Sequence, residues 1–165
     1  MTTSSLTGQS LKMADLLRLV ASAPAAFEQE MVAKGYTCYQ QKKSLTTWSC
    51  LFMDQRPAYM NQPALASDVM QYVFGQHATV LIQQTKSVAD YKAWQSQLIS
   101  LGFSVDKQPQ SSELVGLLYT KDRLSVTLQK VDYYNGISNN QTGYSVSVTW
   151  MRQSPTVAHA RRHQR

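Results

Sequence analysis

Apolar and polar residues alternate most regularly near the end of the chain, over residues 124–129 and 144–150. Every second residue there is aliphatic or aromatic, and the residues between them are Ser, Thr or Gln. This period of two is typical of strands that place one face on a core and the other in water. The pattern extends the two predicted strands to residues 124–131 and 144–151. It predicts further strands at 36–43, 46–53, 78–84, 103–106 and 114–120.

Apolar residues at helical spacing predict three helices, at 11–20, 24–34 and 88–101. Pro24 is tolerated in the first turn of the second helix, and Ser87 can cap the third. Residues 54–66 contain two prolines and are expected to form a loop. Residues 67–75 fit either a short capped helix or a strand, and the pattern does not decide between them.

Together these elements predict an α+β fold in which helices pack on one face of an antiparallel sheet. A repeated pattern adds the hypothesis of a tandem duplication of a helix-plus-β-hairpin unit. An aromatic residue, an aliphatic residue and a glycine occur four positions apart from Phe27 to Gly35, and again 67 residues later from Trp94 to Gly102. The alternative is a common helix-to-strand turn, because glycine readily adopts the left-handed conformation that ends helices.

The composition fits one core, with 43% hydrophobic and 16% charged residues in a chain of 165. The expected organisation is a flexible N-terminus at 1–10, a single α+β domain at 11–151 and a flexible basic tail at 152–165. Sub-repeats at 23–85 and 87–151 are the alternative within the domain.

The net charge of +6 is concentrated at the C-terminal end, because no acidic residue follows Asp132. The tail residues Arg161, Arg162 and Arg165 could bind anions such as nucleic-acid phosphates weakly. On the last strand the aromatic residues share their face with aliphatic ones, which places them in the core and leaves the other face to Ser and Thr. This argues against a nucleic-acid-binding sheet, and weak binding through the tail is an alternative only.

Cys38 and Cys50 form neither a CxxC motif nor part of a zinc-ligand pattern. A hairpin centred on Ser44 would place the two thiols directly opposite each other, so a cross-strand disulfide is one alternative. We expect two buried free cysteines instead, since small apolar packing is the usual role of cysteine in an intracellular domain.

Catalytic motifs are missing from the sequence, which contains no GxSxG, GxGxxG or Walker loop. Of the three histidines only His77 lies within the predicted domain. We therefore predict no catalytic residue, no metal ligand and no cofactor. A small enzyme that uses His77 or a cysteine with a carboxylate is the alternative.

Two tyrosine-containing loops are the predicted binding sites. Adjacent tyrosines cannot both point inward from one strand, so we expect Tyr133, Tyr134 and Asn135 in the segment 132–143 to form a partner-binding loop, together with Tyr59. The resulting hypothesis is a non-enzymatic binding domain of bacterial type, whose partner is an unidentified protein or a small ligand.

The expected location depends on whether the chain is complete. The first ten residues contain no charged segment followed by an apolar one, which predicts a cytoplasmic protein if the chain is full length. An exported or periplasmic protein is expected if a signal has been removed. No run of roughly eighteen apolar residues predicts a membrane span.

Overall fold

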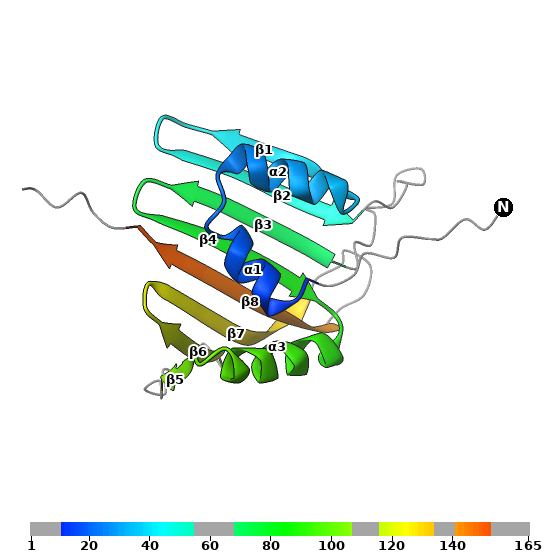
Figure 1. Cartoon of the computed structure of the whole chain (residues 1–165). Helices are drawn as coiled ribbons and strands as arrows, with labels where there is room; N and C mark the ends of the chain where they lie inside the picture. The colour runs from blue at the N-terminus through cyan, green and yellow to red at the C-terminus, as the bar shows by residue number, and fades with distance from the viewer. Residues whose placement is uncertain (1–10, 55–67, 107–115, 134–140, 153–165) are drawn as a thin grey trace, which may run out of the picture.

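The protein folds into an antiparallel sheet that is covered by helices on one face (Figure 1). The computed structural model describes residues 11–54, 68–106, 116–133 and 141–152. The described helices are α1 (Met13–Leu19), α2 (Pro24–Ala33) and α3 (Val88–Ser100). The strands are β1 (Tyr36–Lys43), β2 (Thr47–Asp54), β3 (Asp68–Gly75), β4 (Ala78–Thr85), β5 (Ser104–Asp106), β6 (Gly116–Lys121), β7 (Leu124–Tyr133) and β8 (Gln141–Met151).

The eight described strands form one sheet in the order β1-β2-β3-β4-β8-β7-β6-β5. Strands β4 and β8 join its two halves in continuous antiparallel register, from Ala78 opposite Met151 to Thr85 opposite Tyr144. The turns that connect β1 to β2, β3 to β4 and β6 to β7 all lie at one end of the sheet, on the left in Figure 1. We call this the turn end.

The alternating residues that predicted the sheet form its core face. Apolar side chains on this face meet the buried faces of the helices, and both halves of the sheet contribute to one hydrophobic cluster. Fully buried members include Phe52, Tyr72, Leu81, Val126 and Val148. The predicted α+β class, with an antiparallel sheet and helices on one face, is confirmed.

The undecided segment 67–75 is strand β3, which pairs with β2 on one side and β4 on the other. Local sequence could not decide this, because the pairing partners lie elsewhere in the chain. Strands β7 and β8 are longer than predicted and extend to Tyr133 and back to Gln141. The predicted loop 132–143 is therefore partly strand, and the prediction was wrong at both of its ends.

The predicted signals at helix ends are confirmed. Gly35 and Gly102 follow α2 and α3 with φ angles of +86° and +79°, in the left-handed region that glycine adopts without a steric penalty. The Ser87 hydroxyl accepts a hydrogen bond from the Asp90 backbone N–H at 3.2 Å, which caps α3. Helix α1 is shorter than expected, but the Leu11 carbonyl before it accepts a hydrogen bond from the Trp94 indole at 3.0 Å.

A tandem duplication is not evident in this architecture. The hypothesis was a repeated helix plus one hairpin, which would place two strands after each helix. In the described structure four strands follow α2 and four follow α3, so the expected unit is not present in that form. The corresponding strands also differ in size, since β1 spans 8 residues and β5 spans 3.

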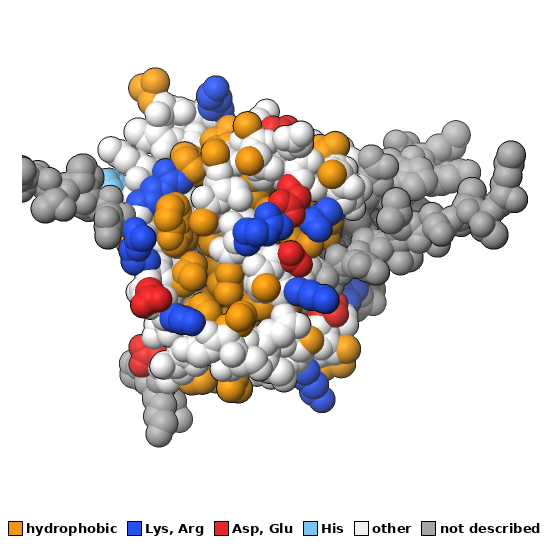
Figure 2. Space-filling view, viewed as in Figure 1, with side chains coloured by type: hydrophobic (Ala, Val, Ile, Leu, Met, Phe, Trp, Pro, Cys, Tyr) orange, Lys and Arg blue, Asp and Glu red, His pale blue; other side chains and the backbone are white. Residues whose placement is uncertain are grey.

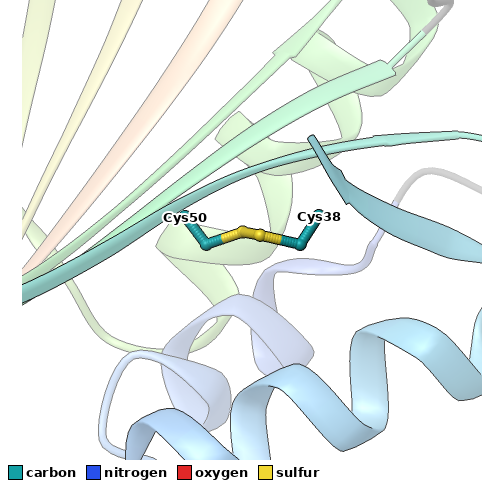
Figure 3. The surroundings of a disulfide bond; sticks show 2 residues. All are labelled: Cys38 and Cys50. Atoms are coloured by element: carbon teal, nitrogen blue, oxygen red, sulfur yellow. A yellow bond between two sulfur atoms is a disulfide. The ribbon is translucent and has the colours of Figure 1, made fainter. Parts of the chain in front are cut away.

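Cys38 and Cys50 form a disulfide between β1 and β2 (Figure 3), so the expectation of two free cysteines is wrong. A β-bulge between Cys38 and Gln40 shifts the register. Cys38 therefore lies opposite Phe52, while Cys50 lies opposite Gln41, and the two cysteines are diagonal neighbours. Their Cα atoms are 6.0 Å apart, within the range that a disulfide spans.

The face of the sheet away from the helices differs between its two halves. On β7 and β8 it presents the predicted hydroxyl groups, among them Thr127 and Ser147. On β3 and β4 the same face includes aliphatic residues, among them Val73, Val80 and Ile82, which are partly exposed. The hydroxyl-rich face predicted from the last two strands is confirmed on β7 and β8 and does not extend to β3 and β4.

None of the helices in the described part of the chain is long and apolar enough to cross a membrane.

Candidate binding surface at the turn end of the sheet

A cleft of about 370 Å³ lies between the start of α2 and the turn from β1 to β2. We call it the hairpin cleft. Its walls combine apolar side chains with a few polar ones. The lining residues are Pro24, Ala25, Glu28, Lys43, Ser44, Leu45, Thr46, Thr47, Trp48 and Phe74.

Leu45 stands at the tip of the β1–β2 turn with its side chain fully exposed, at 106% of the reference area. The turn is held by Ser44, whose backbone N–H donates to the Thr47 carbonyl at 2.8 Å. The Ser44 hydroxyl accepts from the Thr47 N–H at 3.1 Å. These local bonds fix the turn, so the exposure of Leu45 does not depend on any contact made by its own side chain.

The floor of the hairpin cleft is aromatic and rests on a rigid cluster. Trp48 on β2 lies opposite Phe74 on β3. Beneath them Tyr72 packs edge-on against Trp48, with ring centroids 5.6 Å apart, and stacks on Phe27 of α2 at 4.0 Å. The Tyr72 hydroxyl donates to the Ser22 carbonyl at 2.6 Å, and burial raises the pKa of Tyr72 to about 12. Tyr72 is therefore neutral at physiological pH.

The strand register continues this floor across the sheet. Phe74 on β3 lies opposite Thr79 on β4, and Thr79 lies opposite Trp150 on β8. On its other side, Trp150 lies opposite Leu124 on β7. Trp48 is almost buried, whereas Phe74 and Trp150 are each partly exposed. We call Trp48, Phe74 and Trp150 the aromatic row.

Two arginines lie against the aromatic row. The Arg152 guanidinium stacks over Phe74 at 3.7 Å from the ring centroid and lies 5.6 Å from Trp150. The guanidinium of Arg123 lies 5.9 Å from the centroid of the Trp150 ring. Figure 2 shows Lys and Arg side chains beside hydrophobic ones along the left margin, which is the turn end of the sheet. Cation–π contacts of this kind hold the arginines in place while leaving them charged.

Arg152, the first residue of the predicted tail, is anchored to the sheet. Its backbone N–H donates to the His77 carbonyl at 2.9 Å, and its Nη2 donates to the Thr79 hydroxyl at 3.0 Å. Among the described residues, no carboxylate forms an ion pair with Arg152 or Arg123.

Arg18 on the helical face shows the opposite arrangement. Its two terminal nitrogens bond both carboxylate oxygens of Glu30, at 2.7 and 2.5 Å. This hydrogen-bonded pair raises the pKa of Arg18 and lowers that of Glu30. The charge of Arg18 is thus compensated within the chain, while those of Arg152 and Arg123 are not compensated within the described residues.

Of the residues predicted to bind a partner, Tyr133 alone falls within the described residues. Tyr133 is the last residue of β7, where its backbone pairs with Gln141. Tyr59, Tyr134 and Asn135 lie outside the described residues, and so do the tail residues Arg161, Arg162 and Arg165. Their binding roles stay predictions.

The residues considered for an enzyme do not form a catalytic group in the described structure. His77 is exposed in the turn between β3 and β4. Cys38 and Cys50 are joined in the disulfide, so neither offers a thiol nucleophile in this state. Across the described ranges, no three His, Cys, Asp or Glu side chains gather as metal ligands would.

The aromatic row could not be predicted as a surface. The alternation of Trp150 with Val146 and Val148 indicates a core residue, but alternation does not show where the covering helices end. One signal was present for the cleft: Leu45 is an apolar residue within the polar turn between two predicted strands.

The chain matches no protein-family model, none of the curated proteins and none of the solved structures. A function for this surface therefore has to come from its own chemistry.

Proposed function

We propose that the protein is a non-catalytic binding domain that holds a segment of a partner protein at the hairpin cleft. The observation that carries this proposal is the fully exposed Leu45 beside a cleft floored by Trp48 and Phe74. Aromatic and arginine side chains around a concave apolar centre are the usual composition of binding hot spots.

The rigidity of the site supports a binding role. Strand pairing, the aromatic cluster around Tyr72 and the Ser44 turn hold the walls in place before a partner arrives. A preformed site loses little conformational entropy when it binds, which favours affinity.

The test begins with selection of peptides from a random library on the intact wild-type protein. Selected peptides are then titrated against Leu45→Ser and against Ile99→Ser, a matched control at an exposed apolar position of α3. We expect Leu45→Ser to weaken binding by about tenfold or more, as loss of a central apolar contact does, and Ile99→Ser to leave it unchanged.

Two results would overturn the proposal. One is a selection that yields no binding peptide. The other is binding that survives in Leu45→Ser but disappears in Tyr134→Ala, which would return the binding role to the tyrosine loop predicted from the sequence.

A further inference from the structure

The charges beside the hairpin cleft are mostly positive. Lys43 lines the cleft, and Arg152 and Arg123 flank the aromatic row. Glu28 is the one carboxylate among the residues that line the cleft, and it comes from α2 on the opposite side. A partner that lies along the row therefore meets Lys43 and Glu28 at the cleft and the two arginines farther along the row.

Arg152 is oriented as a carboxylate receptor. Stacking on Phe74 fixes the plane of the guanidinium, and the bond to Thr79 fixes its rotation. Nη2 is bonded to Thr79 and Nε is buried, so the donors left for a carboxylate are those of Nη1 and the second hydrogen of Nη2, which a held guanidinium presents in a fixed plane. The ordering cost is already met in the folded protein, since the ring and the hydroxyl position the side chain without a ligand.

Phe74 connects the apolar and cationic parts of the surface. One part of its side chain lines the hairpin cleft, and the Arg152 guanidinium covers its ring at 3.7 Å. A bound segment that places an apolar side chain in the cleft would bring its neighbouring residues to Arg152.

From this arrangement, and resting on the proposed function, we infer that the partner segment is acidic. It places an apolar side chain in the hairpin cleft and an adjacent carboxylate on Arg152, with Arg123 extending the positive surface toward further acidic residues.

Single-stranded nucleic acid is the other polyanion that aromatic and cationic side chains suit. The geometry favours a peptide, because Trp48 is only 9% exposed and packs into the core cluster, which leaves little ring face for a base.

The experiment uses one peptide enriched on the cleft, synthesised in three versions that flank its apolar residue with Glu, Gln or Lys. Each dye-labelled version is titrated against the wild type, Arg152→Gln, Arg123→Gln and the control Lys92→Gln. Lys92 is an exposed lysine of α3, so the control removes the same charge at another place. Thermal melting of each variant separates lost binding from lost folding. Arg152→Lys is melted and titrated as well, because lysine keeps the positive charge but lacks the planar guanidinium.

We expect the Glu version to bind the wild type about tenfold more tightly than the Gln version, and to weaken as salt is added. This preference should shrink in Arg152→Gln and Arg123→Gln and persist in Lys92→Gln. Equal binding of the Glu and Gln versions would overturn the acidic partner but leave the cleft as a binding site. Tighter binding of an oligothymidylate than of the Glu peptide would also overturn it. Absence of binding by all three versions would contradict the proposed function itself.

Discussion

Tyr72 is buried in the aromatic cluster while its hydroxyl holds the connection between α1 and α2. Burial raises the pKa of this hydroxyl from 10.0 to about 12 in the folded protein. The unfolded chain therefore releases the proton at a lower pH than the folded one. The stability associated with the neutral hydroxyl is fully present below pH 10 and is lost as the pH rises from 10 towards 12.

We therefore predict that the wild type loses stability in this alkaline range more steeply than Tyr72→Phe, which has no proton to release at this position. Urea denaturation at a series of pH values measures both slopes. Burial also raises the pKa values of Tyr91 and Tyr119, so the variant should keep a smaller loss. Parallel slopes for the two proteins would show that Tyr72 does not contribute to the alkaline loss.

Among the strands, β1 depends most on a covalent link. It lies at the edge of the sheet, so β2 is its sole strand partner among the described strands, and the bulge interrupts that pairing. The Cys38–Cys50 disulfide closes a loop with a sequence separation of 12. A loop of this length is expected to stabilise the folded state by about 3 kcal/mol, through a restricted unfolded chain.

We predict that reduction with dithiothreitol lowers the free energy of unfolding by about 2–4 kcal/mol. Urea denaturation with and without the reductant measures this, and the Cys38→Ser/Cys50→Ser double variant should behave like the reduced protein. The reductant should not affect the double variant. If the wild type unfolds at the same urea concentration in both conditions, the disulfide does not stabilise the fold.

Elements with strong local signals could be predicted from the sequence, and those fixed by distant contacts could not. The Ser87 cap and the glycines after α2 and α3 act within one helical turn, and they lie where the sequence placed them. Strand β3 is decided by β2 and β4 on its two sides. The disulfide depends on the β-bulge after Cys38, which shifts the register of β1 against β2. Such a bulge cannot be predicted from the sequence, because an extra strand residue changes the register without changing the composition.

The proposed binding surface could not be predicted for the same reason. Its residues come from β2, β3, β8 and the β6–β7 turn, which are separated in the chain and meet only when β8 inserts beside β4. Sequence analysis found the tyrosine loops instead, because adjacent tyrosines form a local signal. Leu45 was visible in the sequence as an apolar turn residue, but its meaning depends on Phe74, which lines the same cleft, and on Arg152, which stacks on Phe74.

At the scale of the whole molecule, the junction of β4 and β8 makes the two halves depend on each other. The two strands pair along the full length of β4, and the hydrophobic cluster runs across the junction without a break. Opening the junction would expose buried Leu81 and Val148 together with the backbone of both strands. The predicted single domain at 11–151 should therefore unfold in one cooperative step, whereas sub-repeats at 23–85 and 87–151 would unfold separately.

The three tryptophans allow each half to be followed by itself, since Trp48 lies on β2 and Trp94 on α3. Trp94→Phe/Trp150→Phe leaves Trp48 as the fluorescent probe, and Trp48→Phe/Trp150→Phe leaves Trp94. Urea unfolding of each variant is recorded by tryptophan fluorescence and by far-ultraviolet circular dichroism. We expect the two signals to coincide within each variant, even if the substitutions shift the midpoints. If fluorescence reports only the early or the late part of the dichroism change, the halves are separate units, because each probe then senses the unfolding of its own half alone.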